Sequence, residues 1–99
     1  MKNLHFAIIA SYNCVKHLNE LEEPTEEQRD LLFDFECKAW SKVTEDDMRE
    51  FNFSGYYAPL YQDFKKEVLK VLQDNKLTFE DNRCYGYLID SVYEIMCTK

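Results

Sequence analysis

Apolar residues recur along most of this chain at intervals of three and four positions, which is the period of one face of an α-helix. The most regular stretch is 59–74, where the residues on this face are Leu60, Phe64, Val68 and Leu72. The stretches 3–22 and 78–97 repeat the pattern, with Leu4, Ile8, Val15 and Leu18 in the first and Cys84, Leu88, Val92 and Ile95 in the second. The pattern therefore predicts three amphipathic helices.

Two local features complicate these helices. The segment from His5 to Ile9 is rich in residues that favour strands, so a short N-terminal strand is the alternative there. Gly86 lies inside the last predicted helix, where glycine costs about 1 kcal/mol relative to alanine. We expect a close helix crossing or a kink at Gly86.

A signal for the start of a helix occurs three times. Thr25, Thr44 and Thr78 each stand three residues before a Gln or an Asp, which is the spacing of a capping box. In this motif the hydroxyl accepts from the backbone N–H three residues on, and the later side chain accepts from the backbone N–H of the threonine. The three boxes predict helices over 25–43, 44–52 and 78–97.

The chain has 99 residues, which is enough for one independent hydrophobic core. Its only chain breakers are two Gly and two Pro, which favours long helices over the many turns of a small β-sandwich. We therefore predict an all-α fold, a compact bundle of four to five helices that forms one domain over residues 1–99. The longest loop is expected from Asn52 to Ala58.

Targeting and metal-binding signals are weak. The apolar run from Phe6 to Ala10 has five residues, too short for a membrane span or a signal peptide, so a cytoplasmic protein is expected. The four cysteines lack paired zinc spacing. Cys14 and His17 could share a helix face, but two ligands fall short of the four that a structural zinc site needs. We expect no metal and no cofactor.

The negative charge is concentrated in one third of the chain. The whole sequence carries a formal charge of −7, whereas residues 20–50 contain twelve acidic and four basic residues and so carry −8. The remainder carries +1. Such a field repels nucleic acid and membranes with anionic lipids, and it attracts basic protein surfaces. The partner is thus expected to be a basic protein, with no direct contact to nucleic acid or membrane.

Acidic residues in this region follow the helical period. Glu26, Asp30 and Asp34 are spaced four apart, so their carboxylates recur about every 6 Å along a helix. That interval is similar to the spacing of phosphates along a nucleic-acid strand. The candidate partner-binding carboxylates are Glu23, Glu26, Glu27, Asp30, Asp34, Asp46, Asp47 and Glu50. The alternative is a solvated helix face that keeps a small domain soluble.

Aromatic residues gather around the predicted loop. Phe51 and Phe53 are interpreted as side chains that close one end of the bundle, whereas Tyr56 and Tyr57 are candidate partner-contact residues. Trp40, with Phe33 and Cys37 at helical spacing, is predicted to lie in the core.

No arrangement of residues indicates catalysis. The chain has no nucleophile motif and no glycine-rich phosphate loop, and its histidines, His5 and His17, lie twelve positions apart without an acidic partner at helical spacing. Its plentiful carboxylates are expected to be exposed, and such groups are poor general acids at neutral pH. The sequence therefore predicts a non-enzymatic protein.

Size, charge and helix content together favour an inhibitor that covers the basic surface of a nucleic-acid-handling protein by nucleic-acid mimicry. The composition, though no motif, resembles that of small acidic helical phage proteins that block restriction or CRISPR nucleases, which would act in the host cytoplasm. One alternative is an immunity protein or antitoxin that neutralises a basic toxin. A further alternative is an oligomeric structural or adaptor module, and a homo-oligomer stays open for each of the three.

Overall fold

The computed structural model describes residues 2–51 and 60–98, with the backbone alone for Lys2 and Glu50. This part of the chain forms five helices and no strand: α1 (Lys2–Glu20), α2 (Glu26–Ser41), α3 (Glu45–Glu50), α4 (Tyr61–Asp74) and α5 (Arg83–Thr98). The all-α prediction is confirmed. The alternative of a strand from His5 to Ile9 is wrong, because these residues lie inside α1, where Ala7 and Ile8 are buried. The predicted loop 52–58 lies outside the described residues.

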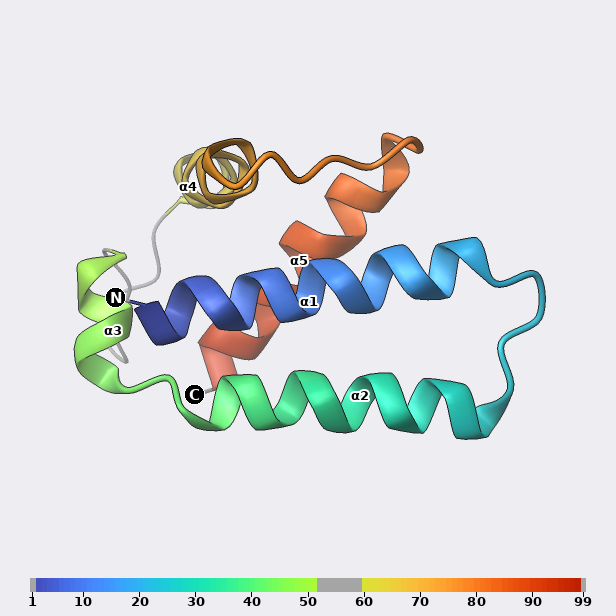
Figure 1. Ribbon diagram of the computed structural model, residues 1–99. Coiled ribbons are helices and arrows are strands. Elements are labelled where there is room, and N and C mark those ends of the chain that lie inside the picture. The colour runs from blue at the N-terminus through green and yellow to red at the C-terminus, as the bar shows by residue number, and fades with distance from the viewer. Residues whose placement is uncertain (1, 52–59, 99) are drawn as a thin grey trace.

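Helix α1 is the centre of the bundle. Figure 1 shows α2 running antiparallel beside α1, α5 crossing behind it, and α4 seen nearly end-on. Helix α1 packs against α2, α3, α4 and α5, whereas α2 makes its extended contact with α1 alone. The Cα radius of gyration of 13.2 Å is close to the ~13 Å typical of a compact domain of this length.

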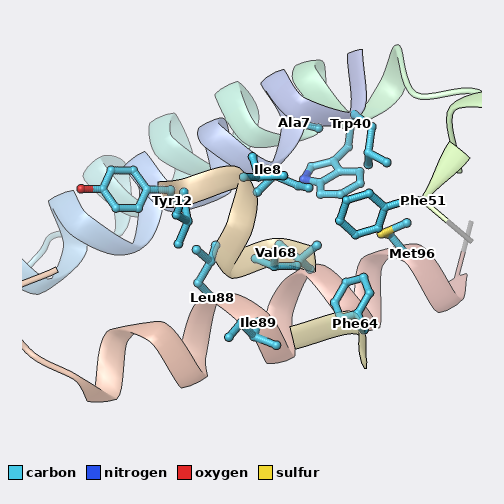
Figure 2. Packing of buried hydrophobic residues seen from close by; sticks show 14 of the residues in the cluster. Ala7, Ile8, Tyr12, Trp40, Phe51, Phe64, Val68, Leu88, Ile89 and Met96 are labelled. Atoms are coloured by element: carbon cyan, nitrogen blue, oxygen red, sulfur yellow. The ribbon is translucent and has the colours of Figure 1, made fainter. Parts of the chain in front are cut away.

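The core is built mainly from α1, α4 and α5, and Figure 2 shows its side chains interdigitating between these helices. Most of the predicted apolar positions are confirmed as buried, namely Leu4, Ile8, Phe64, Val68, Leu72, Cys84, Leu88 and Val92. Leu60 is the clear exception, since 75% of its surface is exposed immediately before α4. Val15, Leu18 and Ile95 are half-buried, at the margins of the apolar stripes.

Two of the three predicted capping boxes are confirmed in full. The N–H of Gln28 donates to the Thr25 hydroxyl at 3.1 Å, and the Thr25 N–H donates to the Gln28 side chain at 2.9 Å. At α3 the N–H of Asp47 donates to the Thr44 hydroxyl at 3.2 Å, and the Thr44 N–H donates to the Asp47 carboxylate at 2.8 Å. These reciprocal bonds satisfy backbone donors that would otherwise lack partners.

The third predicted box, Thr78 with Asp81, is wrong. Contacts with residues distant in sequence hold this segment in a non-helical conformation. The Tyr12 hydroxyl donates to the Thr78 carbonyl at 2.5 Å. The Phe79 ring is buried between Tyr12 and Tyr85, at centroid distances of 4.6 and 5.0 Å, and the Phe79 N–H donates to the Tyr85 hydroxyl at 3.0 Å. These contacts hold an irregular connection, and α5 begins only after it.

The expectation of a close helix crossing at Gly86 is also wrong. Gly86 is exposed, and a Cβ atom placed on it would meet no atom within 4 Å. The helix α5 continues through this position from Arg83 to Thr98. The glycine therefore leaves open space on the outside of the bundle and serves no packing role there.

Candidate partner-binding surface

Helix α2 is anchored to the bundle at its C-terminal end. Trp40 is only 4% exposed, and its indole N–H donates to the hydroxyl of Ser11 on α1 at 2.9 Å. Figure 2 shows the Trp40 ring pointing from α2 into the core. Val43 is buried just beyond the helix, and the first buried residue of α2 along the chain is Glu36. The N-terminal half of α2 therefore contributes no buried side chain.

The prediction that Phe33 and Cys37 join Trp40 in the core is wrong. Phe33 is 60% exposed, and Cys37 is exposed as well. A helix covered by a single neighbour buries only a narrow arc of its circumference. At about 100° per residue, Phe33 lies about 20° beyond Trp40, at the edge of that arc, and Cys37 lies about 60° beyond Trp40.

The carboxylates at the start of α2 lie on a free flank of that helix. Glu23, which precedes the helix, and Glu26, Glu27, Asp30 and Asp34 are all exposed. No cation within the described residues forms an ion pair with any of these five groups. Glu26, Asp30 and Asp34 form a row about 12 Å long. We call this row, together with the exposed Phe33 that lies beside it, the acidic flank of α2.

The candidate carboxylates of α3 are placed differently. Asp46 forms an ion pair with Arg49 at 2.9 Å, and Arg49 also contacts Glu45 at 3.7 Å. Asp47 is buried, and its carboxylate accepts from both the backbone and the hydroxyl of Thr44. Contacts with Arg49 and Thr44 therefore partly neutralise or occupy the carboxylates of α3.

The acidic residues of α2 and those of α3 do not form one continuous row along α2. After Asp34, the next positions on the same flank are Cys37 and Ser41, which carry no charge. The side chain of Glu50 and the residues Tyr56 and Tyr57 lie outside the described part of the chain. The neighbouring Phe51 is buried and packs edge-on against Phe64 at a centroid distance of 5.8 Å, which confirms its interpretation as a core side chain.

An apolar surface that was not predicted from the sequence lies on the other side of α2. Leu31 is 65% exposed and Phe35 59% exposed, and Phe6 of α1 beside them is 65% exposed. We call these three residues the apolar flank. The signal was available, because the run Leu-Leu-Phe-Asp-Phe at 31–35 spreads apolar side chains over more of the circumference than one neighbouring helix covers.

Two shallow grooves follow the apolar flank between α1 and α2. One has a volume of about 430 Å³ and is lined by Asn3, Phe6, Phe35, Lys38, Ala39 and Lys42. The other has a volume of about 270 Å³ and is lined by His17, Leu21, Gln28, Leu31 and Leu32. The lysines give the first groove a basic rim, even though the protein as a whole is acidic.

Titration shifts among the thiols favour their neutral forms. Burial, followed by the negative charge of Glu36, raises the pKa of the Cys14 thiol. Burial also raises the pKa of Cys84. A protonated thiol is the less reactive form of cysteine. Within the described residues, no three His, Cys, Asp or Glu side chains are grouped as metal ligands would be.

None of the described helices combines the length and the apolar character that a membrane span requires. Comparisons with known proteins gave no match: no protein-family model, no curated protein and no solved structure is significantly similar to this chain.

Proposed function

We propose that this protein is a non-enzymatic inhibitor that binds the basic surface of a nucleic-acid-handling protein through the acidic flank of α2. The observation that carries this proposal is the row of Glu26, Asp30 and Asp34, exposed on a helix whose extended contact is with α1. No described cation of the protein pairs with the row, so its charge is available to a partner.

Energetics support a role for the row beyond solubility. Like charges four residues apart destabilise an isolated helix by roughly 0.2–0.5 kcal/mol per pair, and the row contains two such pairs. A basic partner surface turns this repulsion into attraction. Long-range steering by the charge of −7 accelerates the encounter, and the complex weakens as salt rises.

Geometry favours a partner whose basic groove accommodates phosphates. Carboxylates recur about every 6 Å along the row. This interval is similar to the spacing of phosphates along a nucleic-acid strand. Phe33, 60% exposed beside the row, adds an aromatic contact of the kind that often contributes strongly to interfaces. A phosphate-like row with an apolar anchor distinguishes a specific inhibitor from a purely electrostatic one.

The test is affinity capture from a host lysate with matched charge variants. In the first variant Glu26, Asp30 and Asp34 are changed to Lys. In the control, three exposed acidic residues on α4 and α5 are changed to Lys, namely Glu67, Asp74 and Glu94. Both variants alter the net charge equally. We expect the wild type and the control to retain one basic partner, and the α2 variant to lose it.

Competition with duplex DNA completes the test. If the acidic row replaces phosphates, DNA displaces the captured partner, and moderate salt does the same. An unchanged set of captured proteins after charge reversal of the α2 row would contradict the proposal. Equal loss of the partner by the control variant would contradict it too, because it would show that binding is non-specific charge attraction. A captured toxin that DNA does not displace would favour the alternative of an immunity protein or antitoxin.

A further inference from the structure

We propose that the apolar flank of α2 pairs with the same flank of a second copy of this chain, in an antiparallel homodimer with twofold symmetry. The apolar centre of this contact lies on a different side of α2 from the row of Glu26, Asp30 and Asp34, whereas Glu23 and Glu27 are candidate residues of both contacts. Phe33 and Phe35 are two residues apart, so their side chains point about 160° away from each other. Phe33 belongs to the acidic flank and Phe35 to the apolar flank.

The apolar flank exposes three large apolar side chains side by side. Phe6, Leu31 and Phe35 are each about 60% exposed or more and lie along the grooves between α1 and α2. Given the size of such side chains, they offer roughly 350 Å² of apolar surface. The largest apolar patch of a monomer is typically of this size and is often functional, so the flank is a candidate contact site.

The exposed apolar side chains supply part of the area that a stable dimer buries. A stable interface buries about 800 Å² on each partner. The three exposed side chains supply somewhat less than half of this area. The dimer therefore needs further contacts from the residues around them, which include the half-buried Leu21 and Leu32 and the aliphatic stems of Lys38 and Lys42.

The sequence of the flank is suited to helix pairing. Gln28, Leu31, Phe35, Lys38 and Lys42 follow one another at alternating intervals of three and four, which is the spacing of a seam between two helices. An antiparallel pairing centred between Leu31 and Phe35 sets the leucine of each copy against the phenylalanine of the other. The two apolar residues then form the middle of the contact.

Charge complementarity identifies the occupant as a second copy and sets its direction. In the antiparallel register, Lys38 lies opposite Gln28 and Glu27 of the second copy, and Lys42 lies near its Glu23. The symmetry repeats both attractions. A parallel pairing would instead set Lys38 and Lys42 against the same lysines of the other copy. The exposed glutamates at the start of α2 thus match the basic rim at its end.

Sedimentation equilibrium over a range of concentrations tests the dimer. We expect the wild type to dimerise and the double variant Leu31→Asp with Phe35→Asp to dissociate with a dissociation constant raised at least about 100-fold. The matched control is Phe33→Asp, the same kind of substitution at an equally exposed position of α2. This control should leave the dissociation constant unchanged, and circular dichroism should show full helicity in both variants.

A charge swap tests the register. Changing Lys38 and Lys42 to Glu should weaken the dimer, and adding Glu23→Lys and Glu27→Lys to that variant should restore it. A wild type that is monomeric up to about 1 mM would overturn the proposal, as would dissociation by Phe33→Asp. Failure of the swap to restore association would overturn the antiparallel arrangement. If the flank binds only another protein, this chain would sediment as a monomer, which would also overturn the proposal.

Discussion

At the scale of single residues, the bond between Trp40 and Ser11 is the polar connection that holds α2 to α1. Both side chains are buried, and the donor–acceptor distance is 2.9 Å. A Ser11→Ala substitution leaves the indole N–H buried without this acceptor, and such a group costs about 1–3 kcal/mol. We expect Ser11→Ala to lower the free energy of unfolding by that amount in urea titrations followed by circular dichroism.

A double-mutant cycle separates this bond from packing. Trp40→Phe removes the donor and part of the buried ring, and its cost therefore includes a cavity. If the two groups interact as the structure indicates, Ser11→Ala should cost much less in the Trp40→Phe background than in the wild type. Equal costs in both backgrounds would show that the bond contributes nothing to stability.

At the scale of helices, Gly86 is a position in α5 where a substitution should increase stability. Its Cβ position is open, and none of the glycines described has a positive φ angle. A Gly86→Ala substitution removes the entropic cost of glycine in a helix interior without a clash. We expect the free energy of unfolding to rise by about 0.5–1 kcal/mol, measured by denaturant titration at unchanged m-value. A destabilised variant would mean that the position is less open than the structure shows.

Helices were predictable here wherever local signals agreed with packing. The boxes at Thr25 and Thr44 form because their bonds lie within four residues and need no tertiary partner. The box at Thr78 failed because Tyr12, distant in sequence, binds the Thr78 carbonyl, and a contact of this range leaves no local pattern. The pattern of α4 predicted its buried face correctly, because Phe64, Val68 and Leu72 form one apolar stripe on a helix that packs against α1 and α5.

At the scale of the whole molecule, the candidate surfaces could be predicted only in part. The acidic row follows directly from the spacing of Glu26, Asp30 and Asp34. The apolar flank could not be recognised, because apolar residues such as Phe35 resemble core residues until the number of covering helices is known. With α1 as its one extended neighbour, α2 leaves two chemically different sides in water, and that asymmetry is a property of the assembled bundle.

A contact between α4 and α5 also makes the stability of the whole molecule depend on pH in the alkaline range. The Tyr61 hydroxyl on α4 donates to the Asp90 carboxylate on α5, and this hydrogen bond, followed by burial, raises the pKa of Tyr61 to about 12. An unfolded tyrosine has a pKa of about 10. Because the folded pKa is higher, the contribution to stability is complete below pH ~10 and is lost as the pH rises to about 12.

The difference between the wild type and Tyr61→Phe isolates this contribution from the other tyrosines. We expect the wild type to be the more stable protein at neutral pH and its advantage to shrink between pH ~10 and about 12, in urea titrations at each pH. Since Tyr61 is 37% exposed, solvent screens the interaction and the advantage is modest. Asp90→Asn, which keeps an acceptor but removes the charge, should reduce the pH dependence, and a constant difference across this range would contradict the role of the Tyr61–Asp90 contact.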